Sequence, residues 1–537
     1  MRYLLPNWPE MPQLLEEESM VNLAHLFSEH DQDFELLFLR PDPWLRRTLK
    51  ENGLLPEHWW SVFDAIQGIN IPSGQPLDLE DLGLPADTER VFSQSQITIN
   101  RFDRLYATVN AYPSGFILSM ILPNGRQGKE ERFYDDRGFL SYTKIFDPDN
   151  RVVMCYWFDL TGEVVMTQDK SGAITIAPNQ TFRFDHKHYD DLDQVIFEEL
   201  TRHVQTDQNP QMIAMAGMDQ QLLKSLMVRY PVTMLVEEHL SQQERQSVIA
   251  DAAQARHVIS PTANFAKQLQ DFLPEHVTAQ IQLIPPYATR LALGASNETD
   301  ETIIMWHVNG VSKERLKVIY SQLLQAMAKE ERRRLLVIAD SDDQVDLLRR
   351  QAGEFLAQMA GIGTDSDLFA EIKNALHALG QTEADSKITV ENAQVPEPNK
   401  PSTSVTAEAM KQRQNAYQVL RKITHIKYVV KPQVNQLKQW LNISRLLVDL
   451  GDQPNLLLQI GAISTAIPQI NRHETGYVMN HINGRILTRD RELKIALADY
   501  LEKLSEWNRA VVANVKLIDQ HDDDQLMHLW KKVLTNG

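Results

Sequence analysis

Short apolar runs separated by stretches of helical period open the chain. Residues 3–6 and 35–39 form two such runs, and the sequence between them has helical spacing. The same texture returns after about residue 190, where the runs 212–215, 232–236 and 257–259 are separated by further helical stretches. Both pieces of chain therefore predict strands and helices in alternation, which is the pattern of a parallel α/β sheet.

Between these two pieces the pattern changes. Over residues 96–178 turn signals recur about every ten residues, among them 123–125 (Pro-Asn-Gly) and 135–138 (Asp-Asp-Arg-Gly). Stretches rich in β-branched residues, such as 97–99 and 174–176, lie between the turns. This spacing is typical of an antiparallel meander, so we expect a β-sheet domain inserted into the first α/β unit.

A second α/β unit begins near residue 301. Its predicted strands are the apolar runs 302–306, 335–339, 426–430 and 446–450, each of which adjoins a segment of helical period. Buried strands that alternate with helices predict a mostly parallel sheet covered on both faces.

Two further segments complete the predicted organisation. Residues 381–410 are polar and proline-rich, and we interpret them as a mobile loop. Residues 512–534 carry apolar side chains at helical spacing, which predicts amphipathic helices. The predicted domains are an N-terminal Rossmann-like domain (1–91 and 191–298), an inserted antiparallel β-sheet domain (92–190), a C-terminal Rossmann-like domain (299–511) and a C-terminal helical segment (512–537). Two Rossmann-like halves facing a cleft bind ligands at the carboxyl ends of their strands.

The composition narrows the classes of function. The chain has 537 residues, with 54 Lys and Arg against 72 Asp and Glu, and a formal net charge of −18. This excess of acid argues against a nucleic-acid binder and disfavours direct adsorption to anionic lipid. The single cysteine, Cys155, excludes an intrachain disulfide and a thiolate zinc cage. Because the sequence shows no signal peptide and no run of about 18 apolar residues, we expect a soluble cytoplasmic protein.

The stretch 446–470 carries the strongest candidate site. It predicts a strand, a tight turn, a helix and a second strand, with Pro454 in the first helical turn and Asp452 or Gln453 at the cap. A helix amino end in a cleft is a usual seat for a diphosphate, although Asp452 brings negative charge of its own. An ordinary capped helix is the alternative, and it accounts for the same residues.

This stretch resembles the nucleotide-sugar half of GT-B glycosyltransferases. Active retaining members carry two glutamates eight positions apart around the helix, and the match places Gln453 and Gly461 at those positions. Neither residue can supply the charge of a carboxylate. The glycine that usually precedes the last apolar residue of this segment is replaced by Ala466.

The same resemblance implies an arginine and a lysine that hold the diphosphate after the first strand of this half. Lys313 stands for the lysine, whereas the arginine is replaced by Val308 or Asn309, which weakens the clamp. In the first half, a glycine-rich acceptor loop is replaced by Pro-Asn-Trp-Pro at 6–9. We therefore expect a degenerate donor cleft with no catalytic residue, no cofactor and no metal, at the positions His307, Asn309, Lys313, Asp452, Gln453 and Gly461.

A more specific resemblance runs in order along nearly the whole chain. The segments that carry it are 5–8, 59–69, 133–141, 462–470, 477–478 and 483–484. They are similar to the family of the first accessory Sec system protein (accessory secretory protein one). This resemblance implies a GT-B-like, non-catalytic component of a cytoplasmic complex with the second and third accessory Sec proteins.

The implied role is export of heavily glycosylated serine-rich-repeat adhesins, together with the accessory SecA motor and its dedicated channel. The expected partners are these proteins and the serine-rich-repeat glycoprotein itself, with glycan as a further ligand that the resemblance allows. The protein would be peripheral to the membrane through the accessory translocon, without inserting into it. The insertion at 92–190 would contact adhesin or a partner protein.

Two alternatives stay open. One is an active retaining GT-B glycosyltransferase that uses a nucleotide sugar. The other is the regulatory, acceptor-binding subunit of the adhesin O-glycosyltransferase, which also has the inserted sheet.

Overall fold

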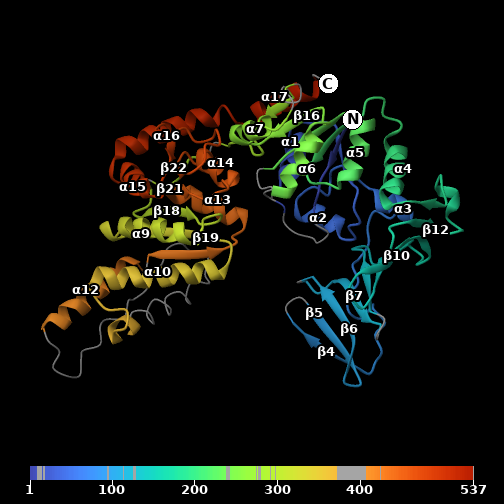
Figure 1. Ribbon diagram of the computed structural model, residues 1–537, viewed down its shortest axis with the longest axis horizontal. Coiled ribbons are helices and arrows are strands. Elements are labelled where there is room, and N and C mark those ends of the chain that lie inside the picture. Colours follow the sequence, from blue (N-terminus) through green and yellow to red (C-terminus); the bar gives the residue numbers. More distant parts are fainter. Residues whose placement is uncertain are drawn as a thin grey trace. The chain divides into compact units, whose positions relative to one another are not determined.

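The structure is a computed structural model whose residues fall into two compact units. It describes residues 1–8, 15, 18–93, 96–112, 114–124, 128–237, 242–273, 275, 280–290, 292–296, 298–371, 407–423 and 425–535. Unit 1 comprises Met1–Ser260, Leu269–Gln282 and Lys531–Gly537, and unit 2 comprises Pro261–Gln268 and Leu283–Trp530. Each unit is described by itself below (Figure 1).

The first sheet of unit 1 is parallel at every pair with a determined register. Its strands are β1 (Arg2–Leu5), β2 (Phe34–Phe38), β3 (Trp59–Ser61), β14 (Gln211–Met215), β15 (Val232–Leu235), β16 (His257–Ser260) and β17 (Ile281–Leu283). They lie in the order β17-β16-β15-β14-β1-β2-β3, so the order reverses between β1 and β14. The helices before, between and after its strands in the chain are α1 (Ser19–Glu29), α2 (Leu45–Glu51), α3 (Val62–Gln67), α4 (Leu192–Val204), α5 (Gln220–Arg229), α6 (Gln242–Ala252) and α7 (Ala263–Gln270), the last of which begins in unit 2.

The second sheet of unit 1 is an antiparallel meander between β3 and β14 in the chain. Its strands are β4 (Thr88–Phe92), β5 (Gln96–Arg101), β6 (Arg104–Ala111), β7 (Ile117–Pro123), β8 (Lys129–Tyr134), β9 (Leu140–Phe146), β10 (Val152–Phe158), β11 (Val164–Asp169), β12 (Ile174–Ile176) and β13 (His188–Tyr189). The spatial order follows the chain order from β4 to β13, so each strand pairs with the next one along the chain. Apolar side chains from residues 77–84 cover one face of its first strands.

Unit 2 contains one parallel sheet. Its strands are β18 (Thr302–His307), β19 (Arg333–Ala339), β20 (Ile426–Val430), β21 (Ser444–Asp449), β22 (Gln469–Asn471) and β23 (Gly484–Ile486). Its helices are α9 (Lys313–Lys329), α10 (Asp342–Ala360), α12 (Ala407–Ile423), α13 (Val434–Ile443), α14 (Leu456–Ser464), α15 (Leu493–Glu502), α16 (Leu504–Ile518) and α17 (Asp523–Thr535), the last of which ends in unit 1. The strand order β20-β19-β18-β21-β22-β23 is that of a dinucleotide-binding Rossmann sheet, with its reversal between β18 and β21.

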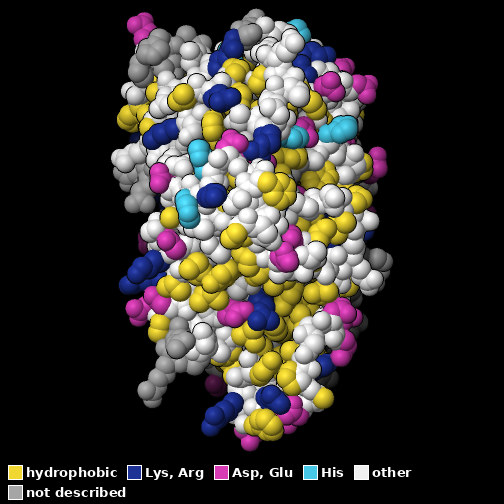
Figure 2. All heavy atoms as spheres, turned by 90° about the vertical axis from the view of Figure 1, so that its right-hand side faces the viewer, with side chains coloured by type: hydrophobic (Ala, Val, Ile, Leu, Met, Phe, Trp, Pro, Cys, Tyr) yellow, Lys and Arg dark blue, Asp and Glu magenta, His cyan; other side chains and the backbone are white. Residues whose placement is uncertain are grey.

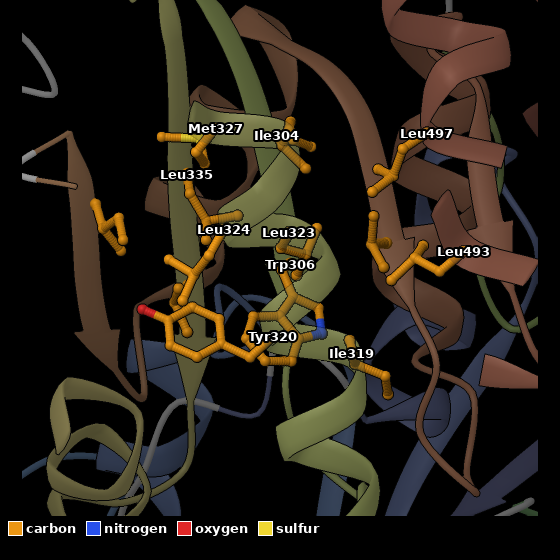
Figure 3. Packing of buried hydrophobic residues seen from close by; sticks show 14 of the residues in the cluster. Ile304, Trp306, Ile319, Tyr320, Leu323, Leu324, Met327, Leu335, Leu493 and Leu497 are labelled. Atoms are coloured by element: carbon orange, nitrogen blue, oxygen red, sulfur yellow. The ribbon is translucent and has the colours of Figure 1, made fainter. Parts of the chain in front are cut away.

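Alternating residues of β18 explain why helices cover both faces of this sheet. Ile304 and Trp306 pack toward α9 and α15, and Trp306 stacks on Tyr320 with ring centroids 5.4 Å apart (Figure 3). Ile303 and Met305 belong to the opposite core, against α13 and α14. A strand whose side chains are buried on both faces has the continuous apolar sequence that predicted it.

The predicted fold class is confirmed: two parallel α/β sheets are present, with an antiparallel sheet inserted in the first. The predicted loop 381–410 lies outside the described residues as far as residue 406. Its last four residues, 407–410, are helical in α12, so the loop prediction was wrong there. None of the helices in the described ranges is long and apolar enough to cross a membrane.

A buried ion-pair cluster fixes the inserted sheet to the first one. Arg137 lies in the turn between β8 and β9, and its side chain is 6% exposed. Its guanidinium donates to Asp135 in the same turn at 2.7 Å, and to both carboxylate oxygens of Asp64 in α3 at 2.7 and 2.9 Å. At the start of α2, Trp44 Nε1 donates to the carbonyl oxygen of Tyr134 at 3.0 Å. The insertion is therefore joined to α2 and α3 through satisfied, buried polar groups.

We predict that Arg137→Met lowers the free energy of unfolding by about 3–5 kcal/mol, because it leaves the buried Asp135 carboxylate without its cation. The matched control is Arg101→Met in the same inserted sheet, since Arg101 pairs with Asp87 at 3.0 Å but both side chains are at least 40% exposed. This surface pair is expected to contribute less than about 1 kcal/mol. Urea unfolding measures both, and equal losses for the two variants would contradict the role given to Arg137.

Candidate functional site

The candidate site lies where the strand order of the unit 2 sheet reverses. His307 ends β18 and Asp449 ends β21, and the two residues are register partners. Both side chains are buried, at 5% and 2% exposure. In doubly wound sheets, ligands bind outside the carboxyl ends of the strands at this reversal. The polar groups at this edge therefore determine which ligand unit 2 could bind there.

A hydrogen-bonded network occupies the buried part of this edge. His307 Nδ1 lies 3.1 Å from Asp449 Oδ1, and Asn309 Nδ2 lies 3.0 Å from His307 Nε2. Because an amide nitrogen only donates, Nε2 accepts and the proton of the neutral imidazole sits on Nδ1, facing Asp449. The other oxygen of Asp449 accepts from the backbone N–H of Asn455 at 3.0 Å and from Gln459 Nε2 at 3.1 Å. Asp449 thus ties β18 and β21 to the start of α14.

The start of α14 differs from the prediction. The helix begins at Leu456 and its cap is Asn455, whose side-chain oxygen accepts from the backbone N–H of Leu458 at 3.0 Å. Pro454 therefore precedes the cap instead of occupying the first turn, and Asp452 and Gln453 lie in the loop before it. The prediction was wrong because the asparagine next to Pro454 is an equally good capping residue and reaches the helix amides directly.

The loops after β18 and β21 are in close contact. The backbone N–H of Asp452 donates to the carbonyl oxygen of Gly310 at 2.9 Å. Gly310 has φ +67°, a conformation that glycine adopts without strain. At Gly451 a Cβ atom would lie 2.4 Å from the carbonyl oxygen of Asn309, so only glycine fits there. The backbone N–H of Asp452, which faces the strand edge, is therefore already hydrogen-bonded within the protein.

An arginine is present beside these loops, but it is paired internally. Arg315, in the first turn of α9, donates to Asp490 through Nε at 2.8 Å and Nη2 at 2.9 Å. It also donates to Asp452 at 2.7 Å and to the carbonyl oxygen of Leu450 at 2.7 Å. A second guanidinium, that of Arg472, lies 3.4 Å from the same Asp490 carboxylate. The hydrogen bonds from Arg315 hold the pKa of Asp490 below its ordinary value.

The remaining predicted positions have different surroundings. Lys313 is exposed in the first turn of α9, and Asp452 and Gln453 are exposed in the loop after β21. Gly461 lies inside α14, where a Cβ atom would be 2.7 Å from the Leu441 side chain of α13. The structure thus brings His307, Asn309 and Asp452 together through their loops, while Gly461 serves helix packing.

Ala466 marks another departure from a glycine pattern. It follows α14 with φ +60° and is 2% exposed, and its N–H donates to the carbonyl oxygen of Ile463. This left-handed conformation is the one that glycine adopts at a helix end, and alanine holds it at a cost of about 1 kcal/mol. Ala466 thus has a backbone conformation that suits glycine, although the residue is alanine.

Sequence reasoning missed Arg315. The resemblance placed the arginine at position 308 or 309, directly after the strand, whereas Arg315 belongs to the helix that follows. The available signal was a basic residue in the first turn of a helix that opens at the strand edge, where a cation opposes the helix dipole and needs acidic partners.

The reversal point of the first sheet is also filled by its own side chains. After β1, Asn7 Nδ2 donates to the carbonyl oxygen of Gly217, which follows β14, at 3.1 Å. Trp8 is 6% exposed, packs on Phe38 with ring centroids 5.0 Å apart, and donates from Nε1 to Glu18 at 3.0 Å. The described part of the loop predicted to replace a glycine-rich acceptor loop therefore contributes to the core.

Glu18 is an ionisable group buried at this edge. Its side chain caps α1 by accepting from the backbone N–H of Val21 at 2.8 Å. Burial raises its pKa to about 7, and the hydrogen bonds from Trp8 and Val21 oppose that rise only in part. Below the ordinary pKa of a glutamate this group costs the folded protein nothing, and the cost grows as the pH rises from about 4.5 to about 7 and stays constant above that.

We predict that Glu18→Gln raises the free energy of unfolding by about 3 kcal/mol at pH 8, with the gain falling to about 1 kcal/mol at pH 5 and vanishing toward pH 4. The glutamine oxygen keeps both hydrogen bonds and removes only the buried charge. Urea unfolding of variant and wild type across this pH range measures the difference. The control Glu89→Gln, at an exposed position of β4, should change stability by less than about 0.5 kcal/mol throughout. A gain independent of pH would contradict the account of Glu18.

Comparisons with known proteins add the following findings. The family model of the first accessory Sec system protein matches residues 4–359 and 383–537. The first accessory Sec system protein of Staphylococcus aureus (strain NCTC 8325 / PS 47) is 23% identical over 551 aligned residues, covering 98% of each chain.

Two solved structures share the fold. One is the crystal structure of accessory secretory proteins 1, 2 and 3 in Streptococcus pneumoniae, with a TM-score of 0.73, 22% identity and coverage of 100% of this chain and 99% of that chain. The other is the pneumococcal O-GlcNAc transferase GtfA in complex with UDP and GlcNAc, with a TM-score of 0.65, 11% identity and coverage of 100% and 98%. The fold is accordingly GT-B-like.

Proposed function

The chain belongs to the family of the first accessory Sec system protein, and from that premise we propose that it is a non-catalytic, glycosyltransferase-like component of the accessory Sec complex. In this role it supports the export of glycosylated serine-rich-repeat adhesins. It works on the cytoplasmic side and reaches the membrane through the accessory translocon. The fold of the donor site is retained, but the site no longer activates a nucleotide sugar.

The observation that carries the non-catalytic part is the internal charge balance at the reversal point of the unit 2 sheet. Two guanidinium groups lie there, those of Arg315 and Arg472, and Asp452 and Asp490 pair with both. A diphosphate needs a guanidinium whose hydrogen bonds are available, and it is repelled by carboxylates at the same place. The protein's own carboxylates thus occupy the donors that a nucleotide sugar would require.

The absence of a carboxylate at positions 453 and 461 also supports a non-catalytic role. Gln453 is neutral, and Gly461 has no side chain to offer; a Cβ atom there would lie 2.7 Å from the end of the Leu441 side chain. A retaining transferase uses acidic groups near the donor to stabilise developing positive charge on the sugar. Without them, a bound donor would be held without being activated.

Assembly is the second part of the proposal. The pneumococcal structure contains accessory secretory proteins 1, 2 and 3 together, and one of its chains has the fold of this one over its whole length. This supports the second and third accessory Sec proteins as partners. The accessory SecA motor, the serine-rich-repeat glycoprotein and its glycan are further partners that we include by family membership.

We predict that wild-type protein gives no calorimetric signal with millimolar UDP-GlcNAc or UDP, because Arg315 and Arg472 are already paired. In the double variant Asp452→Asn/Asp490→Asn the guanidinium groups lose their acidic partners, and we expect UDP affinity to rise at least about tenfold. The control Asp87→Asn/Asp346→Asn makes the same change of charge at exposed pairs elsewhere. Micromolar binding and hydrolysis of UDP-GlcNAc by wild type would favour the active glycosyltransferase instead.

We further predict that this chain elutes as one complex when it is co-expressed with the second and third accessory Sec proteins and passed through a gel-filtration column. Matched co-expression with the catalytic subunit of the adhesin O-glycosyltransferase should leave it in a separate peak. A complex with the transferase subunit alone would favour the regulatory subunit and contradict the proposal.

A further inference from the structure

The inserted sheet ends in an apolar, exposed edge strand. β4 is the last strand in the sheet order and pairs only with β5 among the described strands. Val91 is 56% exposed and Phe92 is 67% exposed, although Phe92 stands opposite the buried Ile97. Hydrophobic side chains gather over the lower part of the face seen in Figure 2, where the strands β4–β7 lie.

The register of the β4–β5 hairpin shows which backbone groups face outward. The N–H of Ser93 donates to the carbonyl oxygen of Gln96, and the pairing continues to Thr88 without a bulge. In an antiparallel ladder, hydrogen-bonded pairs alternate with pairs whose N–H and C=O groups point away from the partner. Counting from Ser93, the residues Arg90 and Phe92 direct their backbone groups to the open side of β4.

Of the devices that usually protect an edge strand, β4 has neither a proline nor a bulge, and its two charged residues are Glu89 and Arg90. Protected edges carry prolines, bulges or charges that a new strand would have to bury. Arg90, the cation of β4, is paired with Glu80 at 2.5 Å in the segment that precedes the strand. The charged residues of β4 precede Val91 and Phe92, so the apolar end of the strand remains suited to receive another strand.

The hairpin tip between β5 and β6, at the Thr88 end of β4, also exposes apolar side chains. Phe102 and Asp103, between β5 and β6, have φ values of +50° and +58°. A phenylalanine in the left-handed region is costly, yet Phe102 is held there with 75% exposure, and Leu105 beside it is 50% exposed. The tip thus presents apolar side chains that the core of the sheet does not use.

We propose that β4 receives an extended segment of a partner polypeptide, which adds a strand to the inserted sheet. The segment would carry apolar residues at two adjacent positions, one covering Val91 on one face and the next covering Phe92 on the opposite face. Its backbone would satisfy the outward N–H and C=O groups of Arg90 and Phe92. This inference rests on the proposed function, since it places the segment in one of the other accessory Sec proteins.

A second copy of this chain fits the edge less well. Two β4 strands that pair antiparallel over their full length set Arg90 opposite Arg90 of the other copy. Like charges directly opposite each other destabilise a pair of strands. A different polypeptide has no such constraint, so the edge favours a hetero-complex over a dimer.

The test is photo-crosslinking in the co-expressed complex with the second and third accessory Sec proteins. A p-benzoylphenylalanine placed at position 92 should form an adduct with one of those two chains. The matched control is position 182, because Phe182 is 83% exposed in the same unit but lies outside β4. The control should give at least about tenfold less adduct.

A second variant measures the contribution of the edge. Phe92→Lys introduces a charge that discourages strand addition at an exposed position, and we expect about tenfold less co-purified partner than with Phe182→Lys. Equal recovery with both variants, an adduct to a second copy of this chain, or no adduct at 92 within an intact complex would overturn the strand proposal and leave the proposed function standing. Failure of the wild-type chain to form the complex would overturn both.

Discussion

The pairing of Arg315 with Asp490 and Asp452 determines what the carboxyl edge of the unit 2 sheet can do. This edge has the backbone layout of a nucleotide site, because the strand order reverses there and two helices begin beside it. Layout alone gives no affinity. Affinity for a diphosphate requires donors and positive charge that are free to meet it, and here intramolecular carboxylates have taken that place.

The same edge contains a buried polar network that holds its loops in place. His307 and Asp449 are buried, and each of their polar atoms has a partner within the network that includes Asn309 and Gln459. Removing one member would leave a buried group unsatisfied, so the network holds the loops in the arrangement that the fold needs. Arg137 plays the corresponding part in unit 1, where it fixes the inserted sheet to α3. Both junctions fix one part of a unit to another through paired polar side chains.

Much of the fold follows from the sequence, and the reasons for the rest are physical. Strands buried on both faces, such as β18 and β21, appear as continuous apolar runs, and the meander appears as regular turn signals. His307 and Asn309 could be placed near Asp452 because strand ends of one parallel sheet share an edge. Arg315 could not, because its partner Asp490 is 175 residues away in the chain and no local pattern joins them. The cap of α14 was misplaced because Asp452 and Asn455 are both good capping residues, and the sequence does not say which of them begins the helix.

The measurement that tests the central claim most directly is a crystal structure of the protein soaked with UDP-GlcNAc. The account predicts that Arg315 stays on Asp490, that the N–H of Asp452 stays on the carbonyl oxygen of Gly310, and that no nucleotide is ordered at this edge. A diphosphate bound by Arg315 in place of Asp490, with the sugar lying against Gln453, would contradict it.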